Sequence, residues 1–108
     1  MYKRGTLILV PFPFTDLSGS KVRPALIISR GKIGQNIMVL FITSKNKSKE
    51  KHLVSIIPDS ENGLKIKSNI VCGKIATLDT KVVLGELGTI SDSLQNQVNK
   101  ELKTVLNL

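Results

Sequence analysis

The sequence has one cysteine, one histidine and no tryptophan. Cys72 has no partner for a disulfide within the chain, as is typical of proteins from a reducing compartment. One thiol and one imidazole are too few for a transition-metal site, so we expect no metal and no cofactor. Apolar runs stay well short of the ~18 residues of a membrane span, and Pro11 and Pro13 interrupt the run that a signal peptide would need. We expect a soluble, cytoplasmic protein without a membrane partner.

Several catalytic signatures are also missing. The sequence contains no CxxC pair, no HExxH motif, no GxxxxGK[ST] loop, no GxSxG turn and no dinucleotide fingerprint. These absences argue against zinc hydrolases, P-loop enzymes and serine hydrolases. The chain has 108 residues, of which 41% are hydrophobic. This size suits one domain with one core, and we assign residues 1–108 to a single domain.

Acidic residues are scarce in the first half of the chain. The whole chain has 16 Lys and Arg against eight Asp and Glu, which gives a net charge of +8. Residues 1–57 hold ten of the basic and two of the acidic side chains, whereas residues 58–108 hold six of each. Such a positive field attracts polyanions, either nucleic acid or an acidic protein. A basic surface that is merely solvated is the alternative, because charge alone identifies no partner.

Short aliphatic segments bounded by turn-forming residues recur along the chain. They predict strands at residues 6–10, 25–29, 36–43, 53–57 and 68–78, the last being one or two strands with a break at Gly73. Pro24 suits the first position of a strand, where a missing N–H matters least. Residues 82–90 form a short segment interrupted by glycines.

The last part of the chain has helical spacing. Apolar residues recur on one stripe, and Ser91 or Asp92 can cap a helix of about four turns; the stripe consists of Leu94, Val98, Leu102, Val105 and Leu106. The chain is thus mainly β with minor α, and we predict a small barrel or strongly bent sheet followed by one C-terminal helix.

A few polar residues are candidates for chemistry. Arg23 lies at a loop-to-strand junction, where a guanidinium can bind a phosphate through two hydrogen bonds and stabilise a pentacovalent phosphorus. A surface arginine paired with Asp16 is the alternative. Thr43 and Ser44 end a buried strand beside a basic loop, and their hydroxyls can hold a phosphate oxygen or cap a turn. His52 can act as a general acid or base, or be a simple exposed histidine.

Three segments carry a more specific pattern than any single residue. They are RGTLILVPFPFTDLSGSKVRPALIIS, FITS and SNIVCGKIATLDTKVVLGELGTIS. In this order, over about residues 3–106, they resemble the opening, the threonine-ended strand and the later strand pair of the MazF/PemK/Kid toxins of type II toxin–antitoxin systems. The resemblance implies an SH3-like small β-barrel of the CcdB/Kid/MazF type with a C-terminal helix, usually a homodimer.

The resemblance also implies an activity and a partner. Members of this family cleave single-stranded RNA selectively and without a metal, by attack of the ribose 2′-hydroxyl on the adjacent phosphate, and so inhibit translation and growth. Their partner is an antitoxin whose acidic, poorly ordered tail covers the RNA groove. The basic first half of this chain suits both RNA and such a tail, because both are polyanionic.

Site residues follow from the resemblance by position. Arg23 would stabilise the charge of the transition state and take part in proton transfer to the leaving 5′-oxygen, and Thr43 would position the scissile phosphate. The mobile first loop that lines the groove would contain Phe14, Thr15, Asp16 and Ser18. Lys21, Ser44, Lys45 and Lys74 complete the expected RNA-binding set.

The chain departs from the family pattern in two places. Some relatives have an acidic residue shortly before the Arg-Pro pair, but residues 18–22 of this chain contain none. Others have Asp-Gln or Asp-Lys where this chain has Gly73 and Lys74, and a relative's arginine corresponds to Ala76. The general base is therefore unassigned, with Asp16 and His52 as candidates, and Lys74 can take over charge stabilisation.

These departures keep two other functions open. One is a catalytically weakened or inactive relative that only binds RNA or the antitoxin. The other is a CcdB-like toxin that acts on gyrase. The chain ends in Leu-Asn-Leu, whereas CcdB-like proteins depend on an aromatic residue near that end, so this second alternative is the weaker one.

Overall fold

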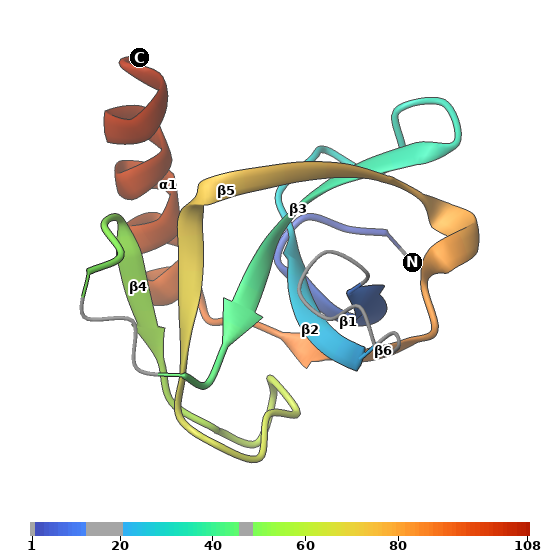
Figure 1. The fold of residues 1–108 in the computed structure, drawn as a ribbon, viewed down its shortest axis with the longest axis horizontal. Helices are drawn as coiled ribbons and strands as arrows, with labels where there is room; N and C mark the ends of the chain where they lie inside the picture. Colours follow the sequence, from blue (N-terminus) through green and yellow to red (C-terminus); the bar gives the residue numbers. More distant parts are fainter. Residues whose placement is uncertain (1, 13–20, 46–48) are drawn as a thin grey trace.

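A curled antiparallel sheet with one helix beside it forms the molecule (Figure 1). The structure is a computed structural model that describes residues 2–12, 21–45 and 49–108. Its strands are β1 (Thr6–Phe12), β2 (Lys21–Ile27), β3 (Asn36–Thr43), β4 (Leu53–Ile56), β5 (Ser68–Asp79) and β6 (Gly85–Thr89). They are arranged in the order β4-β5-β3-β2-β1-β6. A 3-10 turn, η1 (Thr80–Val82), precedes β6, and α1 (Asp92–Leu106) packs on β4 and β5. The predicted mainly β fold with a C-terminal helix is confirmed.

The strand bounds differ from the sequence prediction by one or two residues in β1, β4 and β5, and the start of β2 differs by four. The strand predicted at residues 25–29 begins at Lys21 and ends at Ile27, so Pro24 lies inside it. Pro24 is tolerated because the β2–β3 ladder begins only at Ala25, which leaves β2 with one strand neighbour at the proline. The segment predicted as one or two strands is a single strand, β5, and its register against β3 shifts between Leu40 and Ile42. Figure 1 shows the sharp bend of β5. Strand β5 pairs with β3 on both sides of the bend, but only its first part also pairs with β4.

Side chains alternate between two buried clusters on the two faces of the sheet. One cluster, between the sheet and α1, includes Leu26, Leu40, Cys72 and the helix residues Val98 and Leu102. The other lies on the opposite face of the sheet and consists of Ile8, Val10, Ala25, Ile27, Ile37, Val39 and Phe41. The nearly continuous apolar run of β3 supplies both clusters, which is why it has no polar alternation.

The turn between β4 and β5 closes the curl by packing on β6. The Thr89 N–H donates to the Glu61 carbonyl at 2.8 Å. Two glycines allow this close approach: a Cβ at Gly88 would lie 2.0 Å from the Glu61 carbonyl oxygen, and one at Gly63 would lie 2.3 Å from the Leu87 carbonyl oxygen. Gly63 also has a φ of +73°, which disfavours any other residue. The turn therefore covers an edge strand that would otherwise expose unpaired backbone.

Helix α1 has the predicted cap, but its predicted stripe is buried only in part, because Leu106 is 51% exposed. The Ser91 hydroxyl accepts a hydrogen bond from the Leu94 N–H at 3.2 Å, and the left-handed Asn107 ends the helix. Val98 and Leu102 are its buried residues. Within the described parts of the chain, no helix is long and apolar enough to cross a membrane.

Candidate functional site

Strands β2 and β3 separate at the end that carries Arg23 and Thr43. Their last paired residues are Ala25 and Phe41, and continuing that register by two residues places Arg23 opposite Thr43. At that point β3 pairs with β5, and Thr43 lies opposite Asn69. The separation of the strands leaves a gap that forms part of a pocket. The two residues for which the resemblance implies catalysis therefore lie across one gap, although 20 positions separate them in sequence.

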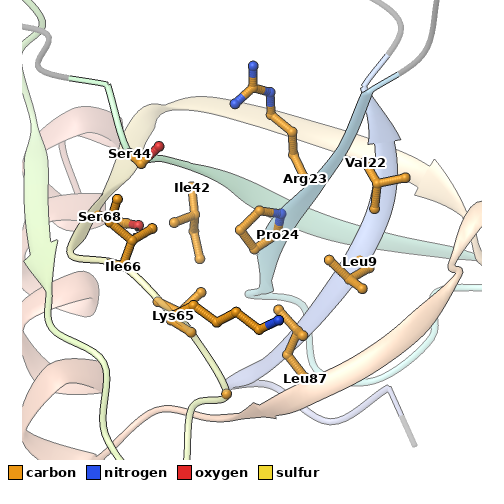
Figure 2. A pocket seen from close by; sticks show the side chains of 12 residues that line it. Leu9, Val22, Arg23, Pro24, Ile42, Ser44, Lys65, Ile66, Ser68 and Leu87 are labelled. Atoms are coloured by element: carbon orange, nitrogen blue, oxygen red, sulfur yellow. Dashed lines mark hydrogen bonds between the residues drawn. The ribbon is translucent and has the colours of Figure 1, made fainter.

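Arg23 and Thr43 belong to the same face of the sheet. Directly opposed residues share a face, as do residues two apart along a strand, so both residues share the face of Ala25 and Phe41. Their neighbours Pro24 and Ile42 point to the other face. In Figure 2 the Arg23 side chain extends away from Pro24 and Ile42. Arg23 and Thr43 are both half-buried, so the sheet holds their backbones while their polar ends stay accessible.

Two further polar residues extend this face across the sheet. Asn69 of β5 is opposed to Thr43 on one side and to Ser55 of β4 on the other. Ser55, Asn69, Thr43 and, by the continued register, Arg23 form a row that crosses four strands; we call it the polar row. Asn69 is half-buried and Ser55 is exposed. Sequence reasoning missed both, although each is a polar residue that alternates with aliphatic ones in a short strand.

The end of β3 offers hydroxyl groups to a ligand. The Thr43 hydroxyl oxygen accepts a hydrogen bond from the Lys45 N–H at 3.2 Å. Because a hydroxyl also donates one hydrogen bond, Thr43 can still donate to a phosphate oxygen. Ser44 and Lys45 are exposed beside it. Lys21 is exposed at the start of β2, two residues before Arg23 and hence on the face of the polar row.

A carboxylate lies next to Lys74, just after the bend of β5. The Lys74 Nζ is 3.6 Å from Glu50 Oε1, and the Lys74 side chain is 61% exposed. An exposed pair of this kind contributes little to stability, on the order of 0–1 kcal/mol. It does place an acidic group beside a predicted RNA-binding residue. Sequence reasoning did not single out Glu50, although it is one of only two acidic residues in the first half of the chain.

His52 faces the helix. Its Nδ1 lies 2.7 Å from Glu101 Oε1 on α1, and its backbone has a positive φ of 62°. Its carbonyl accepts from the Cys72 N–H at 3.0 Å. Neither this pair nor its neighbours belong to the pocket at Arg23. The structure therefore groups His52 with Glu101, apart from the gap between β2 and β3.

Four predicted site residues lie outside the described chain, and the single cysteine is buried. Phe14, Thr15, Asp16 and Ser18 lie outside the described residues. Cys72 is fully buried, and burial, with a smaller contribution from Glu101, raises its pKa to about 11, so the thiol stays neutral near pH 7. Among the described residues, no three His, Cys, Asp or Glu side chains are grouped as metal ligands would be.

Comparison with known proteins decides the family. Residues 3–106 match the model of the PemK-like, MazF-like toxins of type II toxin–antitoxin systems. The chain belongs to this toxin family. The match spans nearly the whole chain, as the three sequence segments predicted. No curated protein matches it significantly.

Solved structures share the fold of the chain. A mycobacterial endoribonuclease in complex with its cognate antitoxin is 23% identical, with a TM-score of 0.77 over 98% of this chain and 95% of the other. The Mycobacterium tuberculosis toxin MazF-mt6 is 20% identical, with a TM-score of 0.76 over 95% and 97%. A MazE–MazF structure from Deinococcus radiodurans is 20% identical, with a TM-score of 0.77 over 98% and 96%. At these identities, the likeness establishes the fold.

Proposed function

We propose that the protein is the toxin of a type II toxin–antitoxin pair and a sequence-selective, metal-independent endoribonuclease that cleaves single-stranded RNA in the cytoplasm. The observation that carries this proposal is that β2 and β3 are paired up to Ala25 and Phe41, beyond which Arg23 and Thr43 follow on the same face, in a chain of the PemK-like, MazF-like family. The mycobacterial structure of the same fold is an endoribonuclease, which supports RNA cleavage as the activity. The excess positive charge of residues 1–57 suits a polyanionic substrate.

In the proposed reaction the RNA supplies its own nucleophile. The ribose 2′-oxygen attacks the adjacent phosphorus and loses its proton to a base, the bond from phosphorus to the 5′-oxygen breaks, and that oxygen takes up a proton. The products are a 2′,3′-cyclic phosphate and a 5′-hydroxyl. Negative charge accumulates on the phosphoryl oxygens in the transition state. Arg23 would neutralise that charge through its planar guanidinium, and Thr43 would hold a phosphate oxygen.

The polar row gives the RNA a path across the sheet. Thr43 and Arg23 would bind the scissile phosphate, and Asn69 and Ser55 lie farther along the same face. An amide side chain both donates and accepts hydrogen bonds, so Asn69 can contact a base edge, as in sequence-selective recognition of unstacked RNA. Lys21, Lys45 and Lys74 would bind flanking phosphates, and their contacts would weaken with salt.

The general base that accepts the proton of the 2′-hydroxyl is not assigned to one residue. Asp16 lies outside the described residues, and His52 is paired with Glu101 on α1. Glu50, beside Lys74, joins them as a third candidate. The three are separable by the pH dependence of cleavage, because replacing the true base removes the acidic limb of the rate profile while replacing the others does not.

Two partners complete the proposal. One is a cognate antitoxin with an acidic segment, in line with the antitoxin complexes of the mycobacterial and Deinococcus proteins of the same fold. The other is a second copy of the chain, because a homodimer would extend the surface available to a long RNA.

Cleavage of a long single-stranded RNA in EDTA tests the proposed activity. We expect discrete cuts that leave 2′,3′-cyclic phosphate and 5′-hydroxyl ends. Cleavage only after addition of a divalent metal would contradict the metal-independent reaction. Intact RNA together with salt-dependent binding in a gel-shift assay would instead favour the alternative of a relative that binds RNA without cutting it.

A further inference from the structure

The face opposite the polar row opens into a pocket of 410 Å³ at the same strand separation (Figure 2). We call it the side pocket. Its apolar lining comes from four strands and the turn before β5, and consists of Leu9, Pro24, Ile42, Leu64 and Leu87. Pockets that hold small ligands measure roughly 300–1,000 Å³, so the side pocket has room for one or two apolar side chains.

The rim of the side pocket combines exposed apolar and positively charged residues. Val22 is 54% exposed and Ile66 is 62% exposed. Arg23 and Lys65 add two positive charges, and they lie toward opposite ends of the pocket in Figure 2. Among the described residues that line the pocket, none is acidic. A ligand that covers this rim must be apolar at its centre and negatively charged around it.

Two of the available ligands fit this description poorly. RNA bases usually stack on aromatic or guanidinium planes. Among the described lining residues, Arg23 on the rim supplies such a plane, whereas the apolar lining itself has no aromatic ring. A symmetric dimer with its two-fold axis through this patch would place the patch against itself, which brings the Arg23 and Lys65 charges together. An acidic peptide with one apolar side chain meets both conditions: carboxylates for the rim and an aliphatic or aromatic group for the lining.

We infer that the side pocket is the anchor site for the antitoxin, which inserts there one apolar residue flanked by carboxylates. This inference rests on the antitoxin part of the proposed function and is independent of RNA cleavage. It assigns the two faces of the strand separation to different ligands: phosphate to the polar row and an apolar side chain to the side pocket.

Binding of the purified antitoxin to Ile66→Ser toxin tests the anchor. We expect the dissociation constant to rise at least about tenfold, the scale of losing an interface anchor. Ile57→Ser is the matched control, because Ile57 is 67% exposed and lies outside the pocket lining. RNA cleavage by both variants should stay at the wild-type rate. An Ile66→Ser toxin that binds the antitoxin as tightly as the Ile57→Ser toxin would overturn the inference.

Charge reversal tests the rim. We expect Lys65→Glu to weaken antitoxin binding about tenfold at low salt and less at high salt, because rim charges act mainly on association. Lys67→Glu is the control, since Lys67 is exposed two residues away and does not line the pocket. Equal effects of the two reversals would mean that only the overall charge matters and that the rim has no special role.

Photo-crosslinking identifies the molecule that occupies the side pocket. With p-benzoylphenylalanine in place of Ile66, irradiation of the toxin–antitoxin complex should link position 66 to an apolar antitoxin residue between acidic ones. Links to a second toxin copy, or to RNA in a parallel reaction, would overturn the inference. If wild-type toxin does not bind the antitoxin at all, the partner in the proposed function is wrong as well, so the two failures are distinguishable.

Discussion

Arg23 and Pro24 are neighbours in sequence, yet they face opposite sides of the molecule. The same contrast holds on the next strand, where Thr43 follows Ile42. Thr43 and Arg23 belong to the polar row, whereas Pro24 and Ile42 line the side pocket, whose rim Arg23 also reaches. Because successive residues of a strand point to opposite faces, one strand separation presents two surfaces of different chemistry. In the proposed scheme, alternation along two strands separates the two ligand classes without a second domain.

The two faces also differ in how they are built. The polar row needs only the register of β2 through β5, which is set by apolar residues on either side of it. The side pocket needs the turn that contains Gly63 and Leu64 to pack on β6. A mutation can therefore damage one face and spare the other, and the following variants test that separation, from the largest expected effect to the smallest.

Replacing Arg23 should affect RNA cleavage most. We expect Arg23→Ala to lower kcat by about 10²–10³, the loss typical of a donor that stabilises charge in a transition state. The fold should persist, because Arg23 is half-buried at a strand end. The exposed Arg30 gives the control Arg30→Ala, which removes the same charge elsewhere. Single-turnover cleavage of the two variants checks this, and equal rates would remove Arg23 from the site.

Replacing Gly63 should damage the side pocket. A Cβ there would lie 2.3 Å from the Leu87 carbonyl oxygen, and the positive φ adds strain. We expect Gly63→Ala to lower the free energy of unfolding by about 3 kcal/mol. Gly31→Ala is the control, because its φ is also positive but no atom lies within 4 Å of the added Cβ. Urea denaturation measures both, and similar losses would show that backbone strain alone is responsible.

Cys72 makes the buried cluster beneath the side pocket sensitive to high pH. Its pKa is raised from 9.0 to about 11 by burial. Between these pH values the unfolded chain releases the thiol proton while the folded chain keeps it, so stability falls as pH rises. The full contribution is about 3 kcal/mol. Urea denaturation at pH 8 and 10.5 measures this effect. Between these two pH values, the free energy of unfolding should fall less for Cys72→Ala than for the wild type. An identical fall would mean that the Cys72 thiol has the same pKa in the folded and the unfolded chain.

Replacing Thr43 should have a smaller effect on cleavage than replacing Arg23. A neutral hydroxyl donor stabilises a phosphoryl oxygen less than a guanidinium does. We expect Thr43→Ala to lower kcat about tenfold, or about 1.4 kcal/mol, while Thr43→Ser retains most of the rate. Cleavage kinetics of the two variants measure this. A serine variant as slow as the alanine variant would point to a packing role of the threonine methyl group.

The sequence predicted the positions of the strands and the helix better than it predicted how the strands pair. Apolar runs located five of the strands, and the helix followed from its stripe and its Ser91 cap. The start of β2 was wrong because residues 21–24 include a proline and two charged residues, which are typical of a loop. Strand pairing to β1 overrides that local preference.

The site was predictable only in part, because the pairing of strands that are distant in sequence brings its residues together. The family resemblance singled out Arg23 and Thr43, but nothing in the sequence shows that they oppose each other. Asn69 and Ser55 join them only through ladders between distant strands. The side pocket was missed altogether, since it gathers single apolar residues from four strands and one turn, each ordinary in its own segment.

The position of the RNA on the polar row can be measured by NMR. The isotope-labelled protein would be titrated with an RNA that has a 2′-deoxyribose at the cleavage site, which removes the nucleophile and prevents turnover. We predict the largest amide shifts at Thr43, Asn69 and Lys74, and little change at Leu64, Ile66 and Leu87. Shifts concentrated at Leu64, Ile66 and Leu87 would place the RNA in the side pocket and contradict the division of the two faces.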